Sequence, residues 1–331
     1  MLTTCVRRGA LLAAVLLTAL GTSLAAAVGP AAAADPDPIS LDPSALPQGP
    51  APAIPYFDPV AKLLHDGGKT LDLTTLKGVV IQLHKVDGGY LLGRRTSPTG
   101  NDLVFLSATG RRTLVSQQWK PPGTCDCLQS DVLVDSSGGS VTFNRRPASG
   151  FYKDTVSVSL PALKTIRTRV FTSAPTLFEQ RGGKALLQLD IRLIRWAPKT
   201  NATATIPSSQ SGPTAVDSSA HQLAFRGDGS GDQTVGPLPP ATGPRWSLDT
   251  DENIGPWSPD DQHIAGADEI VNGGTDTGFI VHRASDGQIA LMVYVAGPAQ
   301  ITWENNTTVL FPTDPDFAGH RQLVRCNLAQ Q

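Results

Sequence analysis

Cysteines offer the most reactive side chains in this sequence. There are four, at Cys5, Cys125, Cys127 and Cys326; Cys5 lies before an apolar N-terminal run that is expected to be cleaved off, which leaves three. In an oxidising compartment, three cysteines form one disulfide and leave one thiol. We expect Cys326 to pair with Cys127 or Cys125, and a local Cys125–Cys127 bridge is the alternative. No histidines follow at the spacing of a zinc site, so no zinc is expected there.

An acidic stretch, DTDENIGPWSPD, carries oxygen ligands in nearly the rhythm of a calcium loop. Asp249, Asp251, Asn253 and Asp260 occupy positions 1, 3, 5 and 12 of the stretch. The glycine that such a loop needs at position 6 is at position 7 instead, as Gly255. We therefore expect a solvated acidic loop, with the four residues as candidate calcium ligands only, and no cofactor.

The histidines and serines form no recognisable catalytic motif. The 6 histidines are scattered, and none belongs to an HExxH pattern. The GDGSGD stretch around Ser230 lacks the first glycine of a nucleophile elbow, because Asp228 occupies that position. No catalytic residue is predicted. A triad assembled from distant loops is defined by geometry and not by spacing, so an enzyme stays the alternative.

The N-terminus reads as a secretory leader. Arg7 and Arg8 precede an apolar run from Ala10 to Leu20, and small residues continue to a cleavage site after Ala34. We therefore expect residues 1–34 to be a signal peptide, residues 35–55 a disordered Pro/Ala-rich tether and residues 56–331 the folded domain. The mature protein is expected to be extracellular, without a stable membrane anchor; a transmembrane anchor is the alternative.

The composition favours an all-β domain that does not bind nucleic acid. The formal net charge is −2, and no basic block stands out. The chain has 32 glycines and 27 prolines, and no stretch keeps a helical apolar period over about ten residues. Short strands separated by turns are the structure that this pattern indicates.

One phrase recurs along the chain. It consists of a short apolar strand, a polar turn and a compact second strand, which together predict a β-hairpin. The six copies are HKVDGGYLLG (84–93), VDSSGGSVTF (134–143), FEQRGGKALL (178–187), VDSSAHQLAF (216–225), PWSPDDQHIAG (256–266) and WENNTTVLF (303–311). They start roughly 40 to 50 residues apart, the period of one propeller blade.

Second hairpins follow some of these copies, with turns at Thr109-Gly110 and Asp286-Gly287. Two hairpins in series make one four-stranded sheet. We therefore predict a β-propeller of about six four-stranded blades; two β-sandwich domains are the alternative. Trp257, Trp303, Phe143, Phe225 and Phe311 are expected in the blade cores. Trp119, Trp196 and Trp246 are better candidates for a wet binding surface.

The phrase PWSPDDQHIAG resembles the W-S-P-D-G-x-x-I-A-F repeat of TolB-like, WD40-like propellers, a group found in many secreted or periplasmic bacterial proteins. Asp261 stands where that repeat has glycine, and Gly266 stands where it has an aromatic residue. In the last copy, Glu304-Asn305-Asn306 replaces S-P-D. The resemblance implies a propeller fold and does not specify a partner.

The ring is expected to close by pairing of N- and C-terminal strands, because the chain ends soon after what reads as a third strand, RQLVRCNL. The strand-like segment Lys69–Leu76 is predicted to supply the missing outer strand, which would remove an exposed sheet edge.

The function expected from the sequence is a secreted, monomeric, non-catalytic binding or scaffolding module, whose loops bind an extracellular protein or glycan. The alternative is an extracellular hydrolase or lyase, whose histidine and acidic residues would converge at the mouth of the propeller channel.

Overall fold

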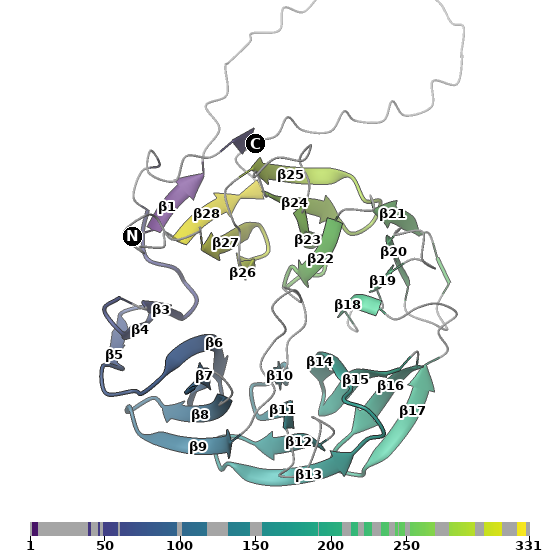
Figure 1. The fold of residues 1–331 in the computed structure, drawn as a ribbon. Helices are drawn as coiled ribbons and strands as arrows, with labels where there is room; N and C mark the ends of the chain where they lie inside the picture. Colours follow the sequence, from purple (N-terminus) through teal and green to yellow (C-terminus); the bar gives the residue numbers. More distant parts are fainter. Residues whose placement is uncertain are drawn as a thin grey trace, which may run out of the picture.

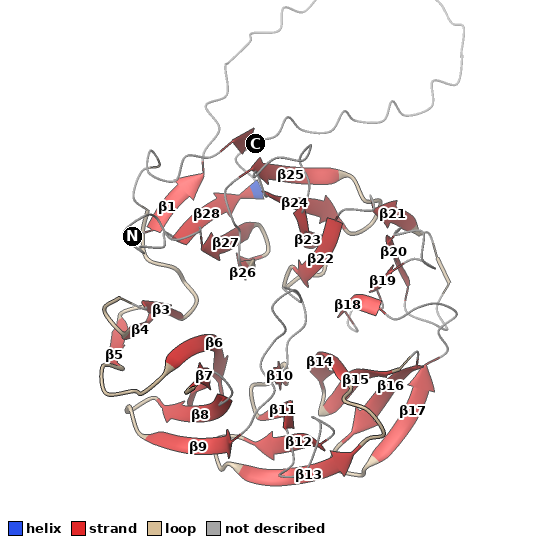
Figure 2. Ribbon diagram, viewed as in Figure 1, coloured by secondary structure: helices blue, strands red, loops and turns tan. Residues whose placement is uncertain are grey.

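The computed structural model describes most of the folded chain and shows a ring of β-sheets (Figure 1). The described residues are 2–5, 39–40, 46, 49–58, 60–97, 101–117, 132–145, 154–190, 192–206, 213–217, 222–226, 233–237, 242–243, 245–248, 252–268, 278–294, 301–312 and 323–328. Strands make up almost all of their regular structure, as Figure 2 shows. No helix in this described part is long and apolar enough to cross a membrane.

Six sheets of four or more strands form blades, which we number along the chain. Blade 1 contains β6 (Val79–Val86), β7 (Gly89–Arg95), β8 (Asn101–Ser107) and β9 (Arg112–Gln117), and blade 2 contains β10 (Val132–Val134), β11 (Ser140–Arg145), β12 (Asp154–Ser159) and β13 (Lys164–Val170). Blade 3 contains β14 (Thr176–Arg181), β15 (Lys184–Leu189), β16 (Arg192–Ala197) and β17 (Ala202–Ile206), and blade 4 contains β18 (Pro213–Asp217), β19 (Gln222–Arg226), β20 (Gln233–Pro237) and β21 (Trp246–Leu248). Blade 5 contains β22 (Glu252–Trp257), β23 (His263–Asp268), β24 (Gly278–Arg283) and β25 (Ile289–Tyr294), with the short β2 (Ile39–Ser40) added beside β25. Blade 6 contains β26 (Thr302–Asn305), β27 (Thr308–Pro312) and β28 (Leu323–Asn327), with β1 (Leu2–Cys5) beside β28.

This arrangement is a β-propeller, and it confirms the predicted fold. The first strand of each blade lies nearest the centre of the ring, and the later strands follow outward (Figure 1). All six copies of the repeated phrase form the first hairpin of a blade. The second hairpins also turn where predicted: Thr109-Gly110 joins β8 to β9, and Asp286-Gly287 joins β24 to β25.

Burial follows the position of a strand within its blade. Middle strands have neighbouring blades on both faces, so they carry continuous apolar runs; Leu103 and Leu106 on β8 are both 0% exposed. The outer strand β13 is different, because its Lys164 and Arg167 are exposed. Charged side chains on an outer strand discourage edge-to-edge aggregation. Separate apolar clusters lie between blades 1 and 2, between blades 2 and 3 and between blades 5 and 6.

A seventh, smaller sheet lies between blade 6 and blade 1 (Figure 1). This N-terminal sheet contains β3 (Tyr56–Asp58), β4 (Leu63–Asp66) and β5 (Lys69–Asp72). Leu64 and Leu73 are buried against Tyr90 of blade 1. The Tyr90 hydroxyl also donates a hydrogen bond of 2.7 Å to Asp66. The sheet is thus attached to blade 1 by both apolar and polar contacts.

The predicted role of Lys69–Leu76 was wrong. Residues Lys69–Asp72 form β5, which pairs with β4 across the two-residue turn Gly67-Gly68 and not with the last blade. Pairing with β4 closes a loop of only two residues, so it costs less conformational entropy than pairing with a strand at the far end of the chain. In the full chain another N-terminal strand completes blade 6: β1 pairs with β28 in parallel, with Cys5 opposite Cys326. This strand belongs to residues 1–34, the expected leader, so cleavage after Ala34 would leave blade 6 with β26, β27 and β28.

The interface between blades 2 and 3 contains buried polar side chains beside its apolar cluster. Ser140, Thr142 and Asn144 alternate along the face of β11 that meets blade 3. The Asn144 side chain donates to the carbonyl of Pro175 over 2.7 Å, and Gln180 of β14 donates to Ser140 over 2.8 Å. A second row, Thr155 and Ser157 on β12, lies opposite Asn144 and Thr142. Thr142, Asn144, Thr155 and Ser157 are all 0% exposed. We call these four residues the polar layer.

Candidate interaction face

The turns of the first hairpins lie together at one end of the ring, which we call the turn face. They comprise Asp87-Gly88 in blade 1, residues 135–139 in blade 2, Gly182-Gly183 in blade 3, residues 258–262 in blade 5 and Asn306-Thr307 in blade 6. Glycine at positive φ allows the tight reversals: Gly88 has φ 76° and Gly138 has φ 73°.

The turn of blade 2 is built around Asp135, which is 5% exposed. One carboxylate oxygen accepts hydrogen bonds from the Ser137 amide over 3.1 Å and from the Ser137 hydroxyl over 2.6 Å. The Gly138 amide donates to the Asp135 carbonyl over 2.6 Å. This use of a short acidic side chain to satisfy the backbone two residues later is a common turn-forming device.

Hydrogen bonds also join the turns of neighbouring blades. The amide of Asp87 in blade 1 donates to the carbonyl of Gly138 in blade 2 over 3.0 Å. The second carboxylate oxygen of Asp135 accepts from the Gly183 amide of blade 3 over 2.8 Å. An isolated bridge between Asp135 and Gln180 adds a third link. The turns of blades 1 to 3 therefore form one connected surface.

Blades 5 and 6 use related turns. In blade 5, Asp260 accepts from the Ser258 hydroxyl over 2.7 Å and from the Gln262 amide over 3.2 Å. In blade 6, Asn305 accepts from the Thr307 amide over 2.9 Å. In blade 5 the serine and the acid exchange places, because Ser258 occupies the position of Asp135 and Asp260 that of Ser137. The turns therefore share a type of side-chain-to-backbone contact, and its position differs from blade to blade.

The backbone conformation of Asp261 explains why this position can differ from the TolB-like repeat that the phrase resembles. Asp261 occupies the position where the TolB-like repeat has glycine, and its φ is 61°. Aspartate tolerates the left-handed region better than most residues other than glycine and asparagine. The turn conformation is therefore retained in blade 5 without glycine.

A shallow, open hollow of about 550 Å³ lies on the turn face between blades 1 and 2. Its lining comprises Lys85, Val86, Asp87, Val134, Asp135, Ser136, Ser137 and Gly138. Asp87 and Ser136 are exposed, whereas Val86 and Asp135 are buried beneath them. The hollow thus has a firmly held floor and a polar rim of both charge signs.

The charges of this region are balanced locally. Lys85 forms an ion pair of 2.8 Å with Asp66, and its side chain is 61% exposed. Burial raises the pKa of Asp135, but hydrogen bonds from Ser137 and Gly183 and the positive charge of Lys199 outweigh it, so the net pKa is lowered. Asp135 is therefore a carboxylate at neutral pH. Its hydrogen bonds serve the turn, so its role is to hold the surface in place.

The described histidines do not gather at one point: His65 lies in the N-terminal sheet, and the others lie in blades 1 and 5. His84 is on β6, where burial lowers its pKa to about 4. His263 on β23 packs beside Trp303, with ring centroids 6.1 Å apart. His282 on β24 packs beside Trp246, and its Nδ1 lies 2.9 Å from the Gly287 carbonyl. Within the described ranges, no three His, Cys, Asp or Glu side chains gather as a metal site would require.

Several predicted site residues fall outside the described residues. These are Asp249 and Asp251 of the calcium candidate and Cys125 and Cys127 of the disulfide candidate. Asn253 lies on β22 but its side chain is not described, and Asp260 uses its carboxylate in the blade 5 turn. Cys326 is buried at 1% exposure in the core of blade 6. The calcium and disulfide predictions stay predictions.

The aromatic candidates have different environments. Phe143, Phe311 and Trp303 are 1%, 0% and 7% exposed, and Trp257 is partly buried beside Val235. Phe225 lies on β19, and its side chain is outside the described set.

The tryptophans predicted at a wet binding surface differ in their exposure. Trp196 was wrongly expected at a wet surface: it is 0% exposed, because β16 is a middle strand covered on both faces. Trp246 is half-buried and donates to the Ala284 carbonyl over 3.0 Å, which joins blade 4 to blade 5. Trp119 lies outside the described residues.

Sequence reasoning did not identify the hollow or the links between turns. The local signal was present, since VDSSGGS contains the aspartate, serine and glycine that form the blade 2 turn. The partner glycine in blade 3 is 48 residues away, and no pattern in the sequence connects the two.

Comparisons with known proteins return fold likeness alone. No family model matches the chain, and no curated protein matches it. Among solved structures, the chain is similar to hydrazine synthase of Kuenenia stuttgartiensis, with 10% identity and a TM-score of 0.47 over 76% of this chain and 77% of that one. It is also similar to Hsv2 of Kluyveromyces lactis, with 10% identity and a TM-score of 0.45 over 72% of each chain. A chain of a mitotic checkpoint complex gives 13% identity and a TM-score of 0.46 over 73% of this chain and 80% of that one.

Proposed function

We propose that this protein is a secreted, non-catalytic binding module that holds an extracellular protein partner on its turn face. The observation that carries this proposal is the hollow between blades 1 and 2, which lies on turns joined to each other by hydrogen bonds. A surface fixed in this way loses little conformational freedom when a partner binds, so less binding energy is spent on ordering it.

The rim of the hollow favours a polar, extended partner segment. Asp87 supplies a carboxylate, Lys85 an ammonium group and Ser136 a hydroxyl, all at exposed positions. The Asp87 carboxylate and the Ser136 hydroxyl match the amide and carbonyl groups of a peptide, whereas a purely apolar helix would cover them without supplying hydrogen-bond partners. Lys85 already pairs with Asp66 and adds positive charge to the rim. A protein partner thus fits the chemistry of the rim.

The binding proposal is tested by capture from culture supernatant with matched variants. Asp87→Arg combined with Ser136→Arg changes the rim, and Ser97→Arg places the same side chain at the other end of blade 1. We expect the wild-type protein and Ser97→Arg to retain the same partner and the rim variant to lose it at least about tenfold. Equal capture by all three forms would move the binding site away from this face.

Secretion is proposed from the leader and has its own test. The first residue of the protein recovered from the medium should be Asp35, as determined by N-terminal sequencing. Recovery of the uncleaved chain in the cell fraction alone would contradict secretion and leave the turn-face proposal untouched.

A further inference from the structure

Blade 6 contains a buried ion pair that is separate from the turn face. Glu304 on β26 and Arg325 on β28 have side chains only 4% and 12% exposed. The Arg325 guanidinium donates from Nε to one carboxylate oxygen over 2.6 Å and from Nη2 to the other over 2.7 Å. Two parallel bonds of this kind fix both side chains in one plane.

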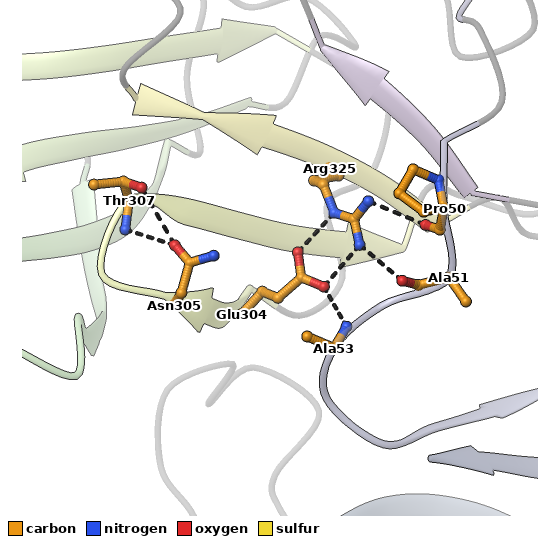
Figure 3. Close-up of polar contacts among 7 residues, drawn as sticks. All are labelled: Pro50, Ala51, Ala53, Glu304, Asn305, Thr307 and Arg325. Atoms are coloured by element: carbon orange, nitrogen blue, oxygen red, sulfur yellow. Dashed lines mark hydrogen bonds and ion pairs between the residues drawn. The ribbon is translucent and has the colours of Figure 1, made fainter. Parts of the chain in front are cut away.

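The pair also binds the backbone of the N-terminal segment (Figure 3). Arg325 donates to the carbonyl of Pro50 over 3.0 Å and to the carbonyl of Ala51 over 3.2 Å. The amide of Ala53 donates to Glu304 over 2.5 Å. Each charged group therefore serves the other and the backbone of residues 50–53 at once.

The contacts depend on the backbone of this segment and not on its side chains. Ala51 and Ala53 are exposed, and no side-chain atom of residues 50–53 takes part in these hydrogen bonds. Pro50 and Pro52 restrict the segment before it binds and carry no amide hydrogen that would need a partner. Ala53 supplies the one amide that donates to Glu304. The pair therefore fits an extended segment in which prolines alternate with other residues and the fourth residue has an amide hydrogen to donate.

We propose that Glu304 and Arg325 form a peptide-backbone clasp whose ligand is the chain's own segment 50–53, and that this clasp closes the ring. The segment runs from blade 6 to β3, which begins at Tyr56 in the N-terminal sheet. The N-terminal sheet is in turn bound to blade 1 through Asp66 and Tyr90. The clasp thus links the end of the chain to its first sheet by side-chain contacts, without using β1. It does not depend on secretion or on the turn-face partner.

Two proline substitutions test the clasp at Ala51 and Ala53, which are exposed, whereas Pro52 between them is buried and is left unchanged. Ala53→Pro removes the amide that donates to Glu304, while Ala51→Pro removes an amide that makes none of these contacts and keeps the carbonyl that Arg325 binds. In the full chain we expect Ala53→Pro to lower the thermal midpoint by a few degrees and to speed hydrogen exchange in β26 and β3. Ala51→Pro should match the wild type. Equal behaviour of the two variants would overturn the proposal.

A double-mutant cycle separates the clasp from general strain. Glu304→Ala and Ala53→Pro should each destabilise the chain, and together they should cost less than the sum of the two, because each alone removes the hydrogen bond from the Ala53 amide to Glu304. Additive effects would show that the Ala53 amide and Glu304 act independently and would overturn the proposal. Light scattering on the wild type should give the mass of one chain. A dimer that dissociates in Ala53→Pro would instead assign the segment to a second copy.

Discussion

The carboxylate of Asp135 in blade 2 accepts a hydrogen bond of 2.8 Å from the amide of Gly183 in blade 3. The same carboxylate organises its own turn through Ser137. Asp135 is thus a junction between two blades as well as a turn residue. Its removal should affect both blades.

Substitution of Asp135 by alanine should lower the free energy of unfolding by about 2–3 kcal/mol, because a buried amide and a turn lose their acceptor. Asp286→Ala is the matched control: Asp286 also caps a turn, but its side chain is 44% exposed. The control should cost at most about 1 kcal/mol, since water replaces the lost bonds. Urea unfolding of both variants measures the difference, and equal losses would contradict the junction role.

Alanine substitutions at two glycines with positive φ distinguish the cost of backbone strain in a turn from the cost of a steric clash between blades. Gly110 has φ 86° and open space around an added Cβ, whereas Gly138 has φ 73° and an added Cβ would lie 3.1 Å from the Asp87 amide nitrogen. Gly110→Ala should cost about 1 kcal/mol from strain alone. Gly138→Ala should cost at least about 1 kcal/mol more, because blades 1 and 2 must separate slightly. Thermal unfolding of the pair checks this order.

Stability should fall between pH 7.5 and pH 5 because of His84. Burial lowers the pKa of His84 to about 4 from 6.5. The unfolded chain therefore binds more protons between these two values, and the free energy of unfolding rises with pH through that window. The contribution is complete above about pH 6.5 and is lost as the pH falls toward 4.

We expect the wild type to lose about 2 kcal/mol between pH 7.5 and pH 5 through this histidine, and His84→Gln to lose much less. Asp135 does not interfere, because a carboxyl with a lowered pKa keeps its contribution above its unfolded value of 3.8 and loses it only in stronger acid. Urea unfolding at a series of pH values measures the free energy of unfolding of both proteins. The same pH dependence in the wild type and in His84→Gln would contradict the assignment to His84.

Two threonines of the polar layer can each be replaced by valine, which has the same shape, and the two substitutions should change the free energy of unfolding in opposite directions. The Thr142 hydroxyl has no hydrogen-bond partner among the described residues, whereas the Thr155 hydroxyl donates to Asn144 over 2.8 Å. Thr142→Val should be neutral or stabilise by up to about 1 kcal/mol, and Thr155→Val should destabilise by about 1–2 kcal/mol. Calorimetry of the two variants tests the order, and the reverse order would refute it.

The sequence made the first hairpins predictable because their information is local. A turn such as VDSSGGS between apolar runs contains the residues that form it, and the six copies repeat that grammar. The N-terminal sheet was missed although Gly67-Gly68 marks its hairpin, because Lys69–Leu76 was assigned to the far end of the chain. Trp196 was misplaced because its exposure depends on neighbouring blades and not on its own strand.

The candidate sites were less predictable for the same physical reason. The Asp135–Gly183 bond and the clasp of Glu304 and Arg325 on residue 50 join positions 48 and 275 residues apart. Such contacts depend on which blades become neighbours in the ring. Local turn residues determine each hairpin, whereas the closure of the ring determines which hairpins come into contact.

The polar layer has a consequence for how this ring arose and how it can be redesigned. Asn144 and Ser140 of blade 2 require a partner that offers the Pro175 carbonyl and the Gln180 amide, and blade 3 supplies both. A blade that is moved, duplicated or exchanged would bury these groups against an apolar face. Shuffling of repeats is therefore blocked at this junction, although the hairpins on either side share one pattern. Blades 2 and 3 would have to be transplanted as an inseparable pair.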